Sequence, residues 1–136
     1  MTCELCELAA PAVYRDDRLS IIMVDDAAYP GFCRVIWNAH VKEMSDLAAP
    51  ERAYVHEAVH QVELALRAVM EPAKINLASL GNMTPHVHWH VVPRFRDDRH
   101  FPAPIWAAPR RDEAVPPERS ERAAGIAAAL IARLGP

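Results

Sequence analysis

The sequence predicts an α+β fold, because short strand-like segments are interrupted by one long amphipathic helix and followed by a second helix. Apolar residues recur every three or four positions in the helical segments, whereas the strand segments are short and rich in branched apolar residues. The composition is that of an ordinary globular protein, with 51% hydrophobic and 24% charged residues. We therefore expect a single domain over residues 1–136.

The first strands are predicted at residues 19–25 and 33–37. The first segment is apolar and ends at the polar pair Asp25 and Asp26. Pro30 and Gly31 then favour a turn, and a connection this short favours antiparallel pairing of the two strands. Two further strands are predicted at residues 75–80 and 87–95, separated by a loop that contains Gly81 and Asn82.

The long helix is predicted between Pro50 and Met70, and Pro72 ends it. Its apolar stripe consists of Val55, Val59, Val62, Leu66 and Val69. A second amphipathic helix is predicted over residues 117–134, with Gly135 as its stop. Residues 96–118 are rich in proline and charge, so we expect an irregular, basic arm there.

Charge and cysteine content restrict the classes of function. The net charge of −3 gives no general attraction to nucleic acids or to anionic membranes. Residues 1–7 lack the layout of a signal peptide, no apolar stretch approaches the length of a membrane span, and three cysteines do not make a disulfide scaffold. We expect a cytoplasmic protein without a nucleic-acid polymer or a membrane as partner.

Three histidines alternate along the last predicted strand. His86, His88 and His90 should share one face, with rings about 6–7 Å apart, while Val87 and Trp89 point into the core. Imidazole is a good nucleophile when neutral and an acid when protonated, which suits phosphoryl transfer. The alternatives are a metal-binding triad and histidines that serve packing alone, although packing would require a buried partner for each ring.

The segment from His86 to Val92 resembles the His-φ-His-φ-His-φ-φ motif (φ, apolar) of the histidine-triad (HIT) superfamily of nucleotide hydrolases and transferases. The likeness covers roughly residues 3–95 and is strongest to a bacterial branch that is similar to diadenosine-tetraphosphate hydrolases. Further matching residues are Ile22 to Asp25, Pro30, Gly31, Val35, Ile36, His40, Asn76, Gly81 and Asn82.

The resemblance implies a sheet of about five antiparallel strands, one long central helix, a C-terminal helix and a homodimer. It implies hydrolysis of a nucleotidyl phosphoanhydride, such as a dinucleoside polyphosphate, with no cofactor required for catalysis. One alternative is a nucleoside phosphoramidase or nucleotidyl transferase with the same nucleophile. The non-enzymatic alternative is a nucleotide- or zinc-binding module.

The resemblance also implies residue roles. His88 would attack the α-phosphorus, His90 would contact the phosphate and assist the leaving group, and His86 would orient the other rings. Asp25 would bind ribose hydroxyls, and residues 19–23 would lie near the base. Asn76 and Asn82 fall in phosphate-side positions; Met83 stands where relatives carry Ser or Thr, so Thr84 is the candidate replacement.

Strand alternation also predicts that Arg94 contacts the substrate. Arg94 shares the even-numbered face with the histidines, so we expect it to reach a polyphosphate.

Two sequence patterns suggest metal binding. The resemblance implies that Cys3 and Cys6 hold a structural zinc ion together with His40 and His86, a chemically sound Cys₂His₂ set. His56 and His60 form an H-E-x-x-H motif, as in zinc proteases. The helical period places that pair beside the core stripe rather than in it, which favours a solvated helix face.

Overall fold

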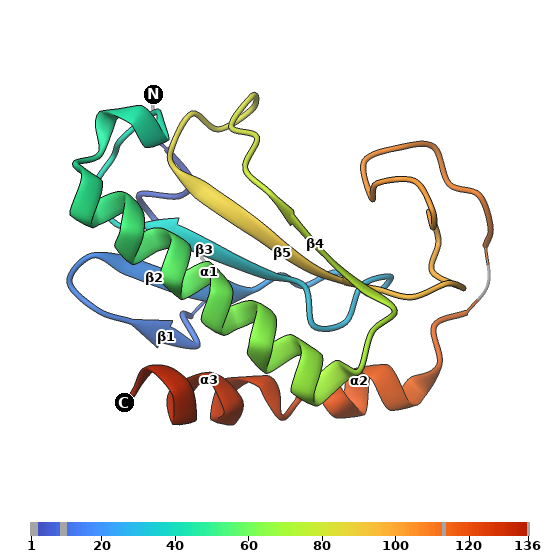
Figure 1. Cartoon of the computed structure of the whole chain (residues 1–136). Coiled ribbons are helices and arrows are strands. Elements are labelled where there is room, and N and C mark those ends of the chain that lie inside the picture. Colours follow the sequence, from blue (N-terminus) through green and yellow to red (C-terminus); the bar gives the residue numbers. More distant parts are fainter. Residues whose placement is uncertain (1–2, 9–10, 113, 136) are drawn as a thin grey trace.

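The computed structural model describes residues 3–8, 11–112 and 114–135. Its centre is a five-stranded antiparallel sheet with the strand order β1-β2-β3-β5-β4 (Figure 1). The strands are β1 (Tyr14–Arg15), β2 (Leu19–Met23), β3 (Cys33–Trp37), β4 (Lys74–Ala78) and β5 (His88–Arg94). The α+β fold and the four longer strands are thus confirmed. The two-residue strand β1 was not predicted.

The helices cover one face of the sheet (Figure 1). They are α1 (Ala49–Met70), α2 (Pro117–Ala123) and α3 (Ile126–Leu134), with a short 3₁₀ turn at Met44–Asp46 before α1. The predicted stripe of α1 is largely buried in the main core, where Val55, Val59, Val62 and Leu66 pack with β-strand residues such as Val35. This packing explains why the stripe predicted the long helix correctly.

The predicted C-terminal helix is in fact two helices. Ala124 and Gly125 form a turn between α2 and α3, and the N–H of Gly125 bonds the carbonyl of Arg122. Glycine is a poor helix former, so the chain reorients there at low cost. Ile126 and Leu130 of α3 are buried, as their spacing predicted, whereas Ile131 is exposed.

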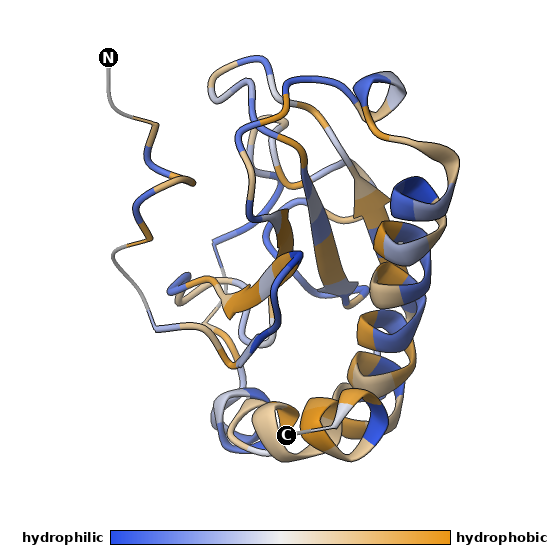
Figure 2. Ribbon diagram, turned by 90° about the vertical axis from the view of Figure 1, so that its left-hand side faces the viewer, coloured by the Kyte–Doolittle hydropathy of each residue, from blue (hydrophilic) through white to orange (hydrophobic). Residues whose placement is uncertain are grey.

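The opposite face of the sheet is partly covered by the N-terminal segment. Figure 2 shows residues 3–8 on the side of the sheet away from α1. Leu5 is buried there against Ile22 of β2 and Ile36 of β3. His88 and His90 lie on the same face, because His88 is paired with Ile36 and His90 with Arg34 across β3 and β5.

Residues 95–112 and 114–116 belong to the arm, and these described residues form no helix or strand, as predicted. The arm leaves the end of β5, loops back and leads into α2 (Figure 1). Within the described ranges, no helix is both long and apolar enough to span a membrane.

Candidate active site

A pocket of about 430 Å³ opens over His88 and His90 on the sheet face that α1 leaves free. The two imidazole rings are 4.9 Å apart between centroids and nearly perpendicular. β3, the segment after β4, the N-terminal segment and the arm form its walls, through Glu4, Leu5, Arg34, Leu80, Gly81, Asn82, Met83, Thr84 and Trp106. The strand alternation therefore brings His88 and His90 together, as predicted.

His88 is held in one tautomer by the backbone. Its Nδ1 lies 2.6 Å from the carbonyl oxygen of His86, and a carbonyl can only accept a hydrogen bond. Nδ1 therefore carries the proton, and Nε2 keeps its lone pair. This is the form of imidazole that can act as a nucleophile.

His90 is kept neutral by its surroundings. Burial, with smaller contributions from His88 and from the Arg34 guanidinium, lowers the pKa of His90 to about 4. Arg34 Nε donates a long hydrogen bond of 3.4 Å to His90 Nδ1, so the proton of the neutral ring resides on Nε2. At neutral pH His90 thus offers an N–H donor, which suits contact with a phosphate oxygen.

His86 does not belong to the row that faces the pocket. It precedes β5, is almost fully buried and is absent from the pocket lining. Its Nε2 contacts the carbonyl of Trp37, while its Nδ1 faces Cys3, Cys6 and His40. Residues 3–8 lie on the same side of the sheet as the pocket (Figure 2), so His86 keeps the face that the alternation predicts, but its ring faces the two cysteines instead of the pocket.

Cys3, Cys6, His40 and His86 form a compact cluster. One ligand atom from each residue lies within 4.8 Å of all the others. The Sγ atoms lie 3.3–3.5 Å from histidine Nδ1 atoms, and the two Nδ1 atoms are 3.2 Å apart. Because the Trp37 carbonyl accepts the Nε2 proton of His86, the Nδ1 of this ring presents its lone pair to the cluster.

The other sequence-predicted residues are dispersed. Asn82 and Thr84 line the pocket, and the Thr84 hydroxyl donates to Glu4 at 2.9 Å. Asp25 is exposed beyond the end of β2 and is not among the pocket residues. Asn76 lies on β4 outside this pocket, and its Oδ1 accepts a 2.6 Å hydrogen bond from Arg94.

Arg94 is the clearest correction among the sequence-predicted site residues. Its side chain is only 2% exposed and forms an ion pair with Asp98 at 2.7 Å. It also donates to the carbonyl of Ala103 and to Asn76. The arm folds over Arg94 and uses its donors within the protein, so this side chain is not available to a polyphosphate.

Two pocket residues were not recognised in the sequence as site residues. Arg34 stands in an otherwise apolar strand, a pattern that marks it as unusual, but only the β3–β5 register shows that it flanks His90. Trp106 lies in the irregular arm, where no sequence pattern relates it to the histidines. Its ring meets the His90 ring at a centroid distance of 5.0 Å and an angle of 68°.

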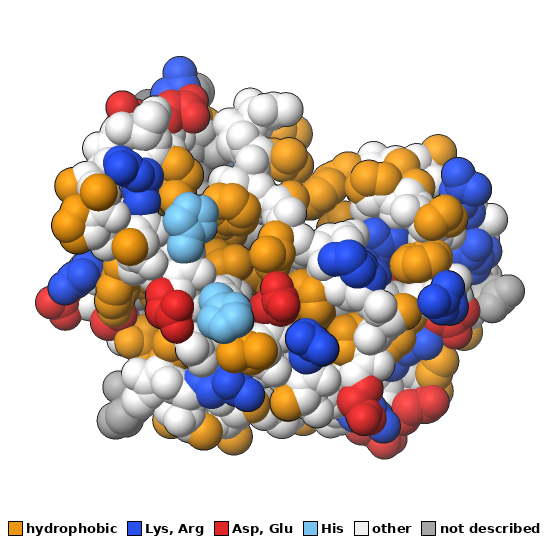
Figure 3. All heavy atoms as spheres, viewed as in Figure 1, with side chains coloured by type: hydrophobic (Ala, Val, Ile, Leu, Met, Phe, Trp, Pro, Cys, Tyr) orange, Lys and Arg blue, Asp and Glu red, His pale blue; other side chains and the backbone are white. Residues whose placement is uncertain are grey.

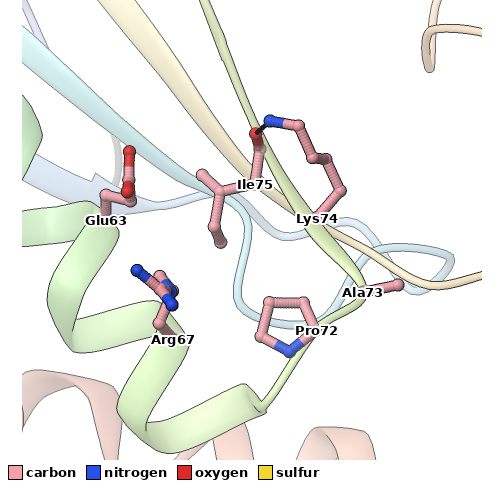
Figure 4. Close-up of a pocket in the computed structure, with 6 residues that line it drawn as sticks. All are labelled: Glu63, Arg67, Pro72, Ala73, Lys74 and Ile75. Atoms are coloured by element: carbon pink, nitrogen blue, oxygen red, sulfur yellow. Dashed lines mark hydrogen bonds between the residues drawn. The ribbon is translucent and has the colours of Figure 1, made fainter.

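A second pocket, of about 300 Å³, lies where α1 connects to β4 (Figure 4). Glu63 and Arg67 of α1 face Lys74 and Ile75 across it, and the Lys74 amine bonds the carbonyl of Ile75. No histidine, cysteine or serine lines this pocket. It therefore lacks the imidazole pair that distinguishes the pocket over His88.

The H-E-x-x-H motif lies on the outer side of α1. His56 and His60 are both exposed. In the part of the chain that the structure describes, the Cys3–Cys6–His40–His86 cluster is the one group suited to hold a metal ion. This result supports the interpretation of the motif as a solvated helix face.

Comparisons with known proteins agree with this geometry. A family model described as the HIT domain matches residues 6–97, whereas no curated protein matches the chain. The chain is similar in structure to a histidine triad (HIT) protein from Sinorhizobium meliloti, with a TM-score of 0.75 and 23% identity over 98% of this chain and 96% of that one.

Two further solved structures share the fold. A histidine triad protein from Bradyrhizobium japonicum has a TM-score of 0.72 and 22% identity, over 91% of this chain and 90% of that one. A Zn-bound histidine triad family protein from Mycobacterium smegmatis has a TM-score of 0.69 and 23% identity, over 98% and 96%. With the family model spanning well over half of the sequence, including the histidine strand, the chain belongs to the HIT domain family.

Proposed function

We propose that this protein hydrolyses a nucleotidyl phosphoanhydride, such as a dinucleoside polyphosphate, through a nucleotidyl-histidine intermediate. The observation that carries the proposal is the hydrogen bond between His88 Nδ1 and the carbonyl of His86. It leaves the Nε2 lone pair of a pocket histidine free for attack, beside a neutral His90.

The reaction takes place in two steps. His88 Nε2 forms a bond to the α-phosphorus while the bridging P–O bond breaks, and the leaving phosphate takes that electron pair. Water then attacks the same phosphorus, the P–N bond breaks, its electron pair returns to His88 Nε2, and the proton that the water loses passes to solvent. His90 donates a hydrogen bond to a phosphate oxygen, and the Arg34 guanidinium supplies a positive charge that balances the charge of the transition state.

We propose in addition that the cysteine–histidine cluster holds zinc. For the usual Zn–S and Zn–N distances of about 2.3 and about 2.0 Å, a tetrahedron has S···N edges of about 3.5 Å and an N···N edge of about 3.3 Å. The separations in the cluster fit these edges closely. A closed four-ligand set supplies structural cross-linking rather than catalysis, and it would tie the N-terminal segment to His40 and His86.

The test is a substrate panel. The purified protein is incubated with diadenosine tetraphosphate and with an adenosine phosphoramidate, and the products are resolved by chromatography. Faster release of AMP from the anhydride supports the proposal. Preferential cleavage of the phosphoramidate would instead assign the same nucleophile to P–N bonds, and no turnover of either compound would refute a hydrolase.

The intermediate can be examined directly. Brief reaction with substrate labelled in the α-phosphate, followed by acid-free denaturation and mass spectrometry, should show one adenylyl group on His88. A His88→Asn variant should show none, and His60→Asn, an exposed histidine of α1, is the matched control that keeps the label. Labelling of another residue would refute the assignment of the nucleophile.

A further inference from the structure

Trp106 lies at the mouth of the histidine pocket. Its side chain is 51% exposed, although its ring contacts the ring of His90. Two more apolar side chains of the pocket lining are exposed, Leu80 at 51% and Met83 at 96%. The pocket thus combines imidazoles and a guanidinium at its base with an apolar rim. On the α1 side of the molecule, a separate hollow lies between the arm and the rest of the chain (Figure 3).

The base of the arm is anchored by buried polar contacts. Arg94 joins β5 to Asp98, and it also donates to the carbonyl of Ala103. Arg111 closes the loop from the other side by donating to the carbonyl of Phe101 at 2.9 Å. These contacts flank Trp106 in the sequence on both sides and tie this part of the arm to β5, so less of the backbone has to be ordered when a ligand binds, which lowers the entropic cost of binding.

We propose that Trp106 is a specificity-determining residue that stacks on an aromatic ring of the leaving group, such as the second nucleobase of a dinucleoside polyphosphate. An exposed indole beside the reacting histidines offers a flat apolar surface, and base–aromatic stacking is a common source of nucleotide affinity. This inference rests on the proposed function, and it adds that the leaving group carries an aromatic ring.

The sheet order assigns Trp106 to the leaving-group side. Trp106 also lines a neighbouring hollow with β4 residues, among them Leu77 and Ala78. Asp25, which the family resemblance associates with ribose hydroxyls, follows β2. β3 and β5 lie between β2 and β4, so a substrate that reaches from Asp25 to Trp106 crosses His88 and His90 with its phosphates.

The test compares two ligands that differ only in the second nucleoside. Diadenosine tetraphosphate and adenosine 5′-tetraphosphate are titrated by calorimetry into a His88→Asn background, which prevents turnover. Trp106→Ala should weaken binding of the dinucleotide about tenfold and change binding of the mononucleotide less than about twofold. Trp106→Phe should recover most of the loss, because a phenyl ring can still stack.

Ile131→Ala is the matched control, because it truncates an exposed apolar side chain on α3, remote from the pocket. It should leave both affinities unchanged. Equal losses for the two ligands in Trp106→Ala, an unchanged dinucleotide affinity, or no binding of the dinucleotide to the parent protein would each overturn the inference.

The experiment separates this inference from the proposed function. If the wild-type protein binds the dinucleotide in a Trp106-dependent manner but hydrolyses neither ligand, the stacking role stands and the hydrolase proposal fails. If both ligands are hydrolysed with the same kcat/KM and that ratio is unaffected by Trp106→Ala, the hydrolase stands and the stacking role fails.

Discussion

Replacing Arg94 with methionine should lower the free energy of unfolding by about 3–5 kcal/mol, because it leaves a buried carboxylate without its partner. The side chains of Arg94 and Asp98 are each 2% exposed, and two N–H···O contacts of 2.7 and 3.0 Å join them. Methionine keeps much of the side-chain volume, so the change removes mainly the charge and the donors.

The magnitude follows from the surroundings of Asp98. Burial acts to raise its pKa, but the hydrogen bonds from Arg94 and from the N–H groups of Phe95, His100 and Phe101 prevail and lower the pKa from 3.8 to about 2. That drop corresponds to about 2.5 kcal/mol of stability, of which Arg94→Met removes only the share of Arg94, because the three backbone N–H groups remain. Asn76 and Ala103 also lose a charged donor, at roughly 1 kcal/mol each.

Urea unfolding at pH 7 measures this loss, with Arg96→Met as the control because Arg96 is exposed on the same segment. The lowered pKa of Asp98 contributes stability that is fully present above pH 4 and disappears as the pH falls through about 2. The difference between Arg94→Met and the wild type should therefore shrink below pH 4. A loss under 1 kcal/mol, together with a raised KM for tetraphosphate substrates, would refute this reasoning and restore Arg94 as a substrate contact.

Three further perturbations test the site. His88→Ala should reduce kcat by about three orders of magnitude while nucleotide affinity changes little, as measured by steady-state kinetics and calorimetry; near wild-type turnover would contradict the covalent route. Protein purified without chelator should contain about one zinc ion per chain by metal analysis. A Cys3→Ser/Cys6→Ser variant should melt at a lower temperature than the wild type. Wild-type protein that contains no metal and is as stable as the same protein with added zinc would exclude the site. Burial lowers the pKa of His90 to about 4, so between pH 6.5 and 4 the unfolded chain binds a proton at this residue and the native state does not. We therefore expect a loss of up to about 3 kcal/mol in the free energy of unfolding over this range. Urea unfolding across this range checks that loss, and a His90→Asn variant with the same pH slope would assign it elsewhere.

The elements of the fold that could be predicted are those in which apolar residues form a recognisable pattern along the sequence. The stripe of α1 and the apolar segments of the four longer strands produce such signals, and each element lies within a few residues of its predicted place. A two-residue strand has no period, so β1 is defined only by the pairing of Tyr14 with Ile21 and of Arg15 with Ser20. The break at Gly125 was missed because the apolar spacing continues across it.

Within the candidate site, alternation along β5 was a reliable guide only for residues inside the strand that no other segment covers. It placed His88 and His90 on one face, in the pocket. It did not show that the cysteines of the N-terminal segment cover the ring of His86, which precedes the strand. It also failed for Arg94, whose backbone position on the strand does not reveal that Asp98 and the arm enclose its side chain.

Arg34 and Trp106 show why the specificity of such a pocket is harder to predict than its chemistry. The proposed nucleophile depends on one side chain and one backbone carbonyl two residues apart, so a short motif contains both partners. Arg34 reaches His90 through a strand pairing across 56 residues, and Trp106 reaches it through an irregular arm. Neither contact produces a periodic pattern or a fixed residue spacing in the sequence. Under the proposed function, the charge and the aromatic surface that would select a substrate are set by tertiary contacts, so a prediction of the substrate has to begin from the tertiary structure.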